Sequence, residues 1–193
     1  MIWKEDRLDQ ITRYDRDGLG RTWRERWKDA GGTTIRTMTY TFDNFSRLTG
    51  VTDPTANYTY VYDALSRVTQ ITHDPDGMTP NVVVDQAFDA SSNRTQLKAA
   101  VGAANDFVND YTLDALNRIT AVTQQSQAGG NAVAAKRANL AYDASDRLTY
   151  VWRYSSVDTS EYVGRVKYIS YDKAGRLTDM KYDGGGITTI DYD

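Results

Sequence analysis

The sequence is poor in the residues on which many catalytic and metal sites depend. Among its 193 residues there is no cysteine and a single histidine, His73. The absence of cysteine excludes disulfides, a thiol nucleophile and a cysteine-ligated metal. His73 stands in the stretch ITHDP, and no serine lies in a nucleophile-elbow motif. We therefore interpret His73 as a solvated side chain at the end of a strand rather than as a general base.

Long apolar runs and glutamate are also scarce. No apolar run approaches the roughly 18 residues of a membrane span, and the first ten residues, MIWKEDRLDQ, lack the apolar core of a secretory signal. We therefore expect a soluble protein whose first methionine is an internal start. The 23 basic and 26 acidic residues give a net charge of −3, which has the wrong sign for a nucleic-acid binder.

Aspartate, tyrosine and threonine are abundant. Only 3 of the 26 acidic residues are glutamate, so the acidic side chains are overwhelmingly aspartate, which favours turns. The 14 tyrosines and 23 threonines favour strands. No segment shows a sustained helical period. The composition predicts an all-β chain of short strands joined by Asp-rich turns.

One pattern recurs along the chain. An aromatic or apolar residue is followed by Asp, three loose positions and then Arg, and successive Asp residues are 20 to 29 positions apart. This is the range of spacings typical of repeat architectures. Asp17 lacks the preceding aromatic, and the copy at Phe88 carries one extra residue. The copies are Asp17…Arg21, Phe42-Asp43…Arg47, Tyr62-Asp63…Arg67, Phe88-Asp89…Arg94, Leu113-Asp114…Arg118, Tyr142-Asp143…Arg147 and Tyr171-Asp172…Arg176.

The position before each Arg holds only small or polar residues. No β-branched or large apolar side chain occurs there, and Gly, Asn and Asp tolerate a left-handed backbone. The pattern predicts a turn that Asp opens and a residue with positive φ closes. The residues at this position are Gly20, Ser46, Ser66, Asn93, Asn117, Asp146 and Gly175.

A strand signal follows each Arg, as in the stretch RVTQIT from Arg67. Each repeat is thus two strands and two turns, and such hairpins must pair edge to edge, because one hairpin is marginal alone. We expect Tyr58, Tyr60 and Tyr62 to share one face of a strand. The prediction is a single array over residues 1–193, with partial repeats at both ends. The partial copies are the segment from Arg7 to Ile11, and Tyr182-Asp183 and Tyr192-Asp193.

Three stretches break the regular spacing. Residues 124–139 are small and polar and predict an extended hairpin tip or a mobile loop. Residues 153–167 form a longer, more aromatic insertion, and residues 80–86 predict a short apolar strand. No linker divides the array into two domains.

The repeated Arg is expected to have a structural task. Flanked by aromatic residues and Asp, it could stack on a tyrosine and pair with an Asp of its own or the next turn. A residue repeated along a scaffold rarely marks one active site. We therefore interpret the repeated Asp, Arg and aromatic residues as structural, and predict no catalytic residue.

Other candidate sites have weaker support. A carboxylate pair for glycoside hydrolysis has no fixed sequence spacing, but most Asp residues here mark turns. Two stretches read D-x-D-G, at Asp15 and Asp74, and lack the third acid and later Glu of a calcium loop. Trp23 and Trp27 could form a sugar-stacking or partner surface, although such residues more often pack on a sheet. We expect no enzyme activity, metal or cofactor.

These copies resemble the YD repeats of the Rhs family. FDNFSRLTGVTDP, YDALSRVTQITHDP and YDKAGRLTDM carry the aromatic-Asp pair, the loose turn, Arg, an aliphatic residue and Thr, and the resemblance runs from about Arg7 to the end of the chain. The resemblance implies a β-sheet that coils into a hollow shell. In bacterial Rhs proteins and related components of Tc toxins the shell encloses a toxin, and teneurins carry a similar barrel at animal cell surfaces.

The resemblance therefore implies a non-enzymatic, secreted or surface-delivered segment of a shell or scaffold. No PxxxxDPxGL-type ending is present, so we expect a partial array rather than a closed container. The rival reading is a self-assembling module whose unpaired strand edges add further copies into filaments. A third reading is a carbohydrate- or partner-binding module. The expected partners are other YD segments, copies of the chain itself, a toxin cargo or a glycan, and not nucleic acid.

Overall fold

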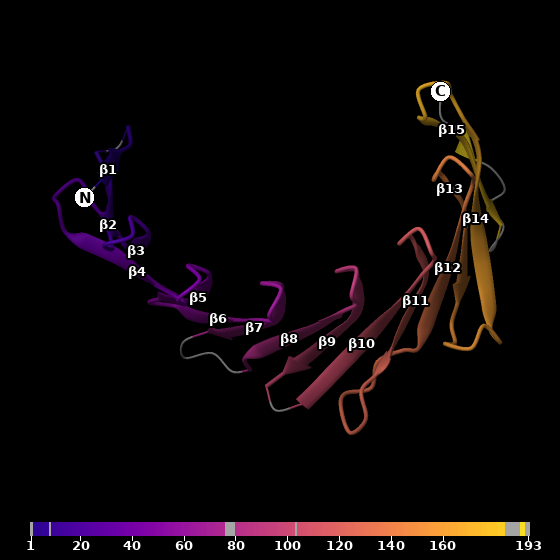
Figure 1. The fold of residues 1–193 in the computed structure, drawn as a ribbon, viewed down its shortest axis with the longest axis horizontal. Coiled ribbons are helices and arrows are strands. Elements are labelled where there is room, and N and C mark those ends of the chain that lie inside the picture. The colour runs from indigo at the N-terminus through magenta and orange to yellow at the C-terminus, as the bar shows by residue number, and fades with distance from the viewer. Residues whose placement is uncertain (1, 8, 76–79, 103, 184–189, 192–193) are drawn as a thin grey trace. The chain divides into compact units, whose positions relative to one another are not determined.

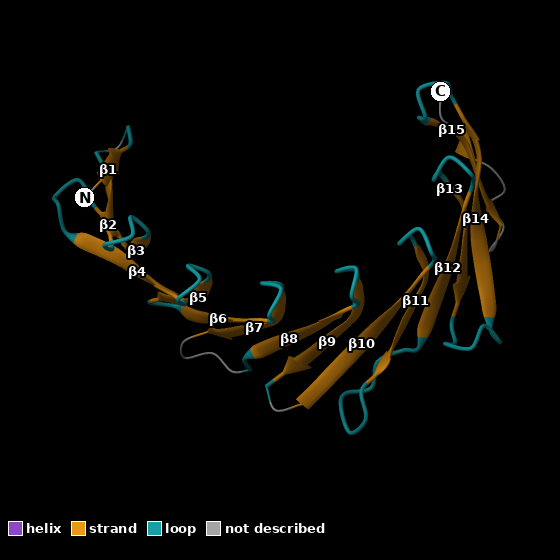
Figure 2. Ribbon diagram, viewed as in Figure 1, coloured by secondary structure: helices purple, strands orange, loops and turns teal. Residues whose placement is uncertain are grey.

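The structure, a computed structural model, describes residues 2–7, 9–75, 80–102, 104–183 and 190–191. Within these residues the chain is all-β, with no helix (Figure 2). Neighbouring strands in the sheet follow one another in chain order, so the protein is a series of antiparallel hairpins (Figure 1). The predicted fold of tandem hairpins in one open sheet is confirmed.

The described strands are short, as the alternation of strand and turn signals predicts. They are β1 (Ile2–Glu5), β2 (Ile11–Arg16), β3 (Thr22–Lys28), β4 (Thr34–Phe42), β5 (Leu48–Asp53), β6 (Ala56–Tyr62), β7 (Val68–Pro75), β8 (Val82–Phe88), β9 (Arg94–Val101), β10 (Ala104–Leu113), β11 (Ile119–Ser126), β12 (Lys136–Tyr142), β13 (Leu148–Tyr154), β14 (Tyr162–Tyr171), β15 (Leu177–Asp183) and β16 (Ile190–Asp191).

The contacts divide the chain into two compact units. The first comprises residues 1–85 and 100–103, and the second comprises residues 86–99 and 104–193. Both units are built from the same hairpin, in which an Asp turn joins two antiparallel strands. The two units therefore share the same repeating hairpin.

The irregular stretches contain more strand than the sequence indicated. Strand β11 extends to Ser126 and β12 begins at Lys136, so only the middle of residues 124–139 is a connection. Residues 155–161 join β13 to β14, and the apolar strand expected over residues 80–86 is β8. In the described part of the chain, no helix is long and apolar enough to cross a membrane.

A β-bulge follows the Arg of the repeats. In the first unit the register shifts between Val61 and Tyr62, whose partners are Gln70 and Val68, so that Thr69 of β7 is the extra residue. Strand β6 keeps its alternation, in which Tyr58, Tyr60 and Tyr62 are half-buried while Thr59 and Val61 are exposed. This agrees with the expectation that the three tyrosines share one face. Comparable shifts lie at Asp15/Arg16, Thr41/Phe42, Thr112/Leu113, Ala141/Tyr142 and Ser170/Tyr171.

The core of each unit is thin. The buried apolar side chains among the described residues are small or medium in size, and no large side chain there is fully buried. Stability must come chiefly from contacts between neighbouring strands and turns rather than from a second packed layer. The buried apolar residues are Ala56, Ala99, Val108, Ala121 and Val166.

Candidate functional site

The Asp turn is a five-residue unit closed by backbone and carboxylate hydrogen bonds. The amide of Asp63 donates to the carbonyl of Arg67 at 3.0 Å, and the amide of Ser66 donates back to the carbonyl of Asp63 at 3.0 Å. The Asp63 Oδ1 atom accepts the amides of Leu65 at 2.9 Å and Arg67 at 3.0 Å. Asp63 therefore opens the turn by capping amides that no strand partner could satisfy.

The residue that closes the turn has a left-handed backbone. Ser66 has φ 63°, a conformation that only a small or polar residue adopts at low cost. This explains why the position before Arg never holds a β-branched residue. The same conformation occurs at Gly20, Ser46, Asn117, Asp146 and Gly175.

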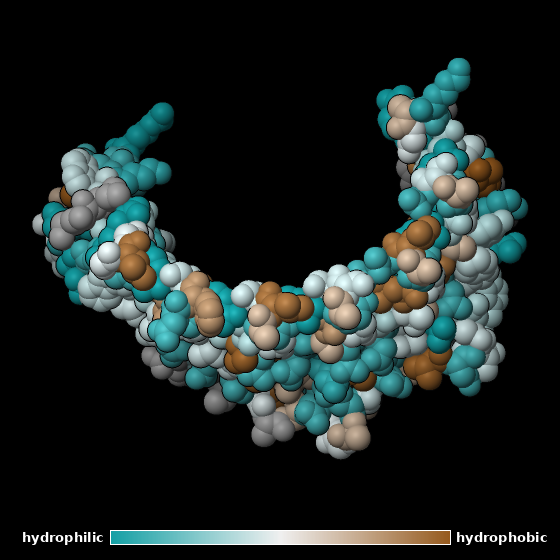
Figure 3. Space-filling model, viewed as in Figure 1, coloured by the Kyte–Doolittle hydropathy of each residue, from teal (hydrophilic) through white to brown (hydrophobic). Residues whose placement is uncertain are grey.

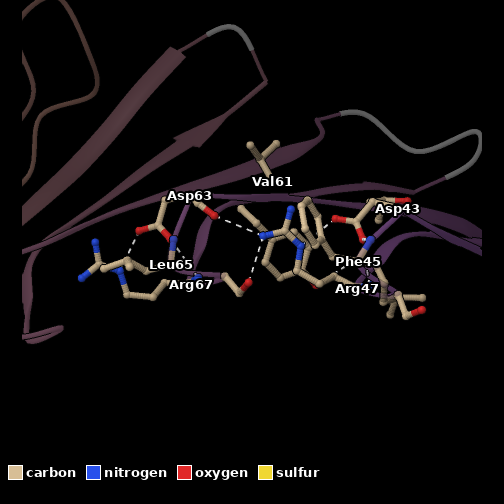
Figure 4. Close-up of polar contacts among 12 residues, drawn as sticks. Asp43, Phe45, Arg47, Val61, Asp63, Leu65 and Arg67 are labelled. Carbon is tan, nitrogen blue, oxygen red and sulfur yellow. Dashed lines mark hydrogen bonds and ion pairs between the residues drawn. The ribbon is translucent and has the colours of Figure 1, made fainter.

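The Arg of each repeat is clamped to the Asp of its own turn. Arg67 Nε donates to Asp63 Oδ2 at 2.6 Å (Figure 4). The same contact recurs in the other turns that end in Arg, where the distance between Arg Nε and Asp Oδ2 is 2.6 to 2.8 Å. One Asp carboxylate thus fixes both the turn backbone and the direction of the guanidinium. The pairs are Asp17–Arg21, Asp43–Arg47, Asp114–Arg118, Asp143–Arg147 and Asp172–Arg176.

From this clamp the guanidinium reaches the following repeat. Arg47 Nη1 donates to the carbonyl of Asp63 at 3.1 Å and to Ser66 Oγ at 3.2 Å. Its guanidinium carbon lies 4.6 Å from the centre of the Tyr62 ring and 5.2 Å from that of Phe45. Figure 4 shows Arg47 beside Phe45. Arg47 therefore joins one turn to the next through hydrogen bonds and a cation–π contact.

The preceding repeat of the first unit has the same arrangement. Arg21 Nη1 donates to Ser46 Oγ at 3.1 Å and to the carbonyl of Asp43 at 3.4 Å. The Arg21 guanidinium carbon lies 4.6 Å from the centre of the Phe42 ring. The contact therefore depends on an aromatic ring and does not require a phenol.

The second unit repeats this geometry. Arg118 Nη1 donates to Asp146 Oδ1 at 2.7 Å and to the carbonyl of Asp143 at 3.4 Å, and its guanidinium stacks 4.8 Å from the centre of the Tyr142 ring. Arg147 stacks 4.9 Å from the centre of the next ring, Tyr171. We call this succession of Asp-clamped arginines, each seated on the following aromatic ring, the arginine ladder.

Where the aromatic residue is tyrosine, its hydroxyl adds a bond in the opposite direction. The Tyr62 hydroxyl donates to the carbonyl of Leu48, the residue after Arg47, at 2.7 Å. The equivalent bonds join Tyr142 to Ile119 at 2.9 Å and Tyr171 to Leu148 at 2.5 Å. Each such pair of repeats is therefore held from both sides.

The hydrogen bonds of the turn lower the pKa of its carboxylate. For Asp63, Asp114, Asp143 and Asp172 the largest cause is the backbone amide of the repeat Arg, and the guanidinium contributes in the same direction. The hydrogen bond that Arg118 donates to Asp114 in turn raises the pKa of Arg118. These groups are ion pairs at neutral pH, and none is poised to exchange a proton there.

One copy differs from the sequence interpretation. The turn from Asp89 ends at Asn93, whose carbonyl accepts the amide of Asp89 at 3.0 Å, and Ser92, not Asn93, has the positive φ of 67°. The interpretation of Asp89…Arg94 as a turn with one extra residue is therefore wrong. Asn93 occupies the position of Arg, and Arg94 is the first residue of β9.

In this repeat Asn93 makes the hydrogen bonds of the ladder arginine, and Arg94 makes a contact with an aromatic ring. Asn93 Nδ2 donates to Asp89 Oδ2 at 3.0 Å and to Asn117 Oδ1 at 2.8 Å, so it joins its own turn to the next one. Arg94 stacks 5.1 Å from the centre of the Tyr111 ring. Phe88, the aromatic residue of this copy, ends β8.

Two further Asp turns lie at the opposite ends of the strands of the first unit, where the sequence pattern did not place them. Asp29 opens a turn that Thr33 ends, with φ 82° at Gly32. Asp6 likewise opens a turn that ends at Gln10. The interpretation of Arg7 as a repeat arginine is therefore wrong. A search for Asp followed three positions later by a residue that tolerates positive φ, as Asp9 and Gly32 do, would have found both turns.

The remaining candidates are structural or lie outside the described residues. Asp15 is buried and pairs with Arg24 at 2.7 Å and Arg26 at 2.8 Å, while Asp17 opens a ladder turn. Tyr182 and Asp183 end β15. Asp76, Gly77, Tyr192 and Asp193 are outside the described residues. In the part of the chain that is described, no three His, Asp or Glu side chains form a metal-binding group.

Comparisons with known proteins gave one family match and several similar solved structures. Residues 47–79 match the family model described as RHS Repeat. Among curated proteins no match was found. A crystal structure of TcdB2-TccC3-TEV is 13% identical, with a TM-score of 0.42, over 100% of this chain and 14% of that chain. A porin-like protein from Bacteroides uniformis is 12% identical, with a TM-score of 0.41, over 98% of this chain and 90% of that chain. The chain thus spans about 14% of the length of the first of these structures.

Proposed function

We propose that this chain, which matches an RHS repeat over residues 47–79, is a non-enzymatic segment of a repeat-built shell or scaffold of the Rhs/YD-repeat type that encloses or displays a toxin or another cargo. A wall of this kind acts outside the cell that makes it, either secreted or at the cell surface. Its partners are other YD segments and the cargo.

The observation that carries this proposal is the arginine ladder. Arg21, Arg47, Arg118 and Arg147 are each bound by structural groups of two successive repeats, as Arg47 is by Asp43, Asp63 and Tyr62. Repeats joined only to their neighbours extend a sheet without converging on a single pocket. This is what a wall requires, and it is not how a catalytic site concentrates its groups.

Electron microscopy of the purified chain, with its mass in solution, tests the proposal. A wall segment is expected to give discrete monomers or sheet pieces with no regular long-range order. Unfolding of the isolated chain, or a compact globular particle that processes a substrate, would contradict it.

A second candidate function is self-assembly into filaments, which an exposed ladder arginine favours. The side chain of Arg176 is 82% exposed, against 21% for Arg67 and 39% for Arg147. Within the described residues, Arg176 is clamped to Asp172 but stacks on no ring. The exposed guanidinium of Arg176 could bind the aromatic-Asp turn of another copy of the chain in the way that the other ladder arginines bind the next turn.

The turns of the first unit add an apolar surface that a neighbouring segment could cover. Leu19, Phe45 and Leu65 occupy the third position of three successive ladder turns and are 73%, 81% and 64% exposed. Apolar side chains gather along the turn-bearing edge of the sheet (Figure 3). Contact with another repeat segment would remove this surface from water.

Two variants separate the candidates in the same microscopy experiment. Regular filaments that disappear in Arg176→Ala would establish assembly through the exposed guanidinium of Arg176. Filaments that survive Arg176→Ala and disappear in Phe45→Asp would assign them to the apolar turn edge. The absence of filaments in the wild-type chain would contradict the second candidate function and would favour the wall segment.

A further inference from the structure

Glu25 is a carboxylate without a cationic partner in a unit whose buried acids all have one. The buried Asp15 pairs with Arg24, and the buried Asp53 pairs with Arg36. Within the described residues no Lys or Arg lies within ion-pairing distance of the Glu25 carboxylate. Burying half of a carboxylate without a counter-charge costs folding free energy. The presence of Glu25 here therefore calls for an explanation.

Two neutral donors hold the Glu25 carboxylate in a fixed position. Trp27 Nε1 donates to Glu25 Oε1 at 2.6 Å, and the Tyr40 hydroxyl donates to Glu25 Oε2 at 3.1 Å. Burial, and then the charge of Glu25, raise the pKa of Tyr40 to about 12. The hydroxyl therefore remains a donor at all physiological pH values. The negative charge is oriented but not neutralised.

Aromatic residues surround this charge on one face of the first unit. Tyr14 lies directly opposite Glu25 in the pairing of β2 with β3. A hollow of about 280 Å³ is lined by Tyr14, Glu25 and Trp27, and an adjoining hollow of about 460 Å³ is lined by Tyr14, Glu25 and Tyr40. Glu25 and Tyr14 thus belong to both hollows, and the three aromatic residues lie around the carboxylate.

The nearby cations have other partners, with the exception of Lys4. Arg21 lines the larger hollow, but its guanidinium is bound by Asp17 and stacks on the Phe42 ring. Arg36 stacks 5.3 Å from the centre of the Trp27 ring, but its guanidinium is bound by Asp53. Lys28 Nζ donates to the carbonyl of Gly32 at 2.8 Å. Lys4 lines the smaller hollow and has no ion pair within the described residues. The centre of the cluster therefore combines uncompensated negative charge with aromatic surface.

We propose that Glu25, Tyr14, Trp27 and Tyr40 form a binding site for an alkylammonium cation. Aromatic faces attract a desolvated ammonium group through their quadrupole, and a fixed carboxylate supplies the counter-charge. A trimethylammonium group or a lysine side chain of a partner matches this chemistry. The ligand is distinct from the ladder arginine Arg21, which also lines the larger hollow but is already bound by Asp17.

Titration of the whole chain with choline tests this site. The signal of the Trp27 indole N–H in a heteronuclear NMR spectrum reports binding directly, because this group touches Glu25. We expect a saturable shift with choline and none with 3,3-dimethyl-1-butanol, which has the same shape without the charge. An equal response to both compounds, or no saturable response to choline, would overturn the proposal.

Matched variants assign the binding to this carboxylate. Glu25→Gln keeps the side-chain volume and is expected to weaken choline binding about tenfold, as befits loss of the counter-charge in a partly desolvated site. Glu161→Gln, which changes an exposed glutamate of the other unit, is expected to leave binding unchanged. Unchanged affinity in Glu25→Gln would refute the assignment.

A third variant removes an aromatic face and leaves the hydrogen bonds of Glu25 intact. Tyr14→Leu is expected to weaken choline binding about threefold, since one cation–π face is lost while both donors to Glu25 remain. Unfolding by urea controls for damage to the sheet. Full affinity in a folded Tyr14→Leu chain would count against the aromatic part of the site.

Discussion

At the scale of the residue, the structure depends on a few positions whose backbone or side chain has no good substitute. Ser66 closes its turn with a left-handed backbone, and Asp63 satisfies two amides and one guanidinium with a single carboxylate. Tyr62 offers its ring to Arg47 and its hydroxyl to the preceding strand. The repeat is therefore recognisable in sequence because each of these tasks restricts the residue type.

Replacing Ser66 by valine is expected to destabilise the chain by about 2 kcal/mol, because a β-branched residue is strained at positive φ. Ser66→Gly is expected to stay within about 0.5 kcal/mol of the wild type, since glycine relieves the backbone while the bond from Arg47 is lost. Urea unfolding measures both values. Ser145→Val, in a turn position without positive φ, is the control. An equal loss in all three variants would show that the left-handed backbone is not the cause.

At the scale of the element, the hairpin was largely predictable and its finer geometry was not. The Asp-to-Arg spacing and the small residues before Arg predicted the turns, because both follow from local backbone chemistry. The bulge at Thr69 could not be predicted, since it depends on the pairing of β7 with β6. The role of Asn93 as the last residue of its turn was missed, because Arg94 follows it directly and was taken for the repeat arginine.

The repeat at Asn93 departs from the ladder at two coordinated positions. Asn93 replaces the arginine and Leu113 replaces the next aromatic residue, so neither half of the cation–π contact is present. Restoring only the arginine or only the aromatic ring should add little stability, because each would lack the other as its partner.

Asn93→Arg and Leu113→Tyr together are therefore expected to be more stable than the sum of the single variants. The expected coupling is about 0.5–1 kcal/mol, the range of an exposed cation–π contact. A double-mutant cycle by urea unfolding measures it. Additive effects would mean that the displaced Arg94 already fills the place that a ladder arginine would take.

At the scale of the whole molecule, stability should depend on pH at both extremes. The pKa of Asp63, Asp114, Asp143 and Asp172 is lowered in the folded chain, chiefly by the backbone amide of the repeat Arg, and hydrogen bonds from Ser160 lower that of Asp158 to about 2. A lowered carboxyl pKa gives stability that is present above the unfolded value of about 4 and is lost as the pH falls towards the folded value. Tyr40, with its pKa raised to about 12, gives stability that is lost as the pH rises above about 10.

The urea midpoint is accordingly expected to be flat between about pH 5 and 9, and to fall below about pH 4 and above about pH 10. Asp114→Asn should lower the midpoint at neutral pH and reduce the loss on acidification, because one of the responsible carboxylates is gone. Tyr40→Phe should likewise reduce the fall of the urea midpoint above about pH 10, because the responsible phenol is gone. A midpoint that stays constant down to pH 3 would show that the turn carboxylates are not coupled to folding.

The most direct test of the arginine ladder is the coupling energy between Arg47 and Tyr62, residues of adjacent repeats. Arg47→Met, Tyr62→Leu and the double variant, unfolded in urea, give this energy free of each residue's other contacts. The ladder predicts a favourable coupling of about 1 kcal/mol, as expected for a partly buried cation–π contact. A coupling of zero would contradict it, because the ring of one repeat would then contribute nothing to holding the arginine of the preceding repeat.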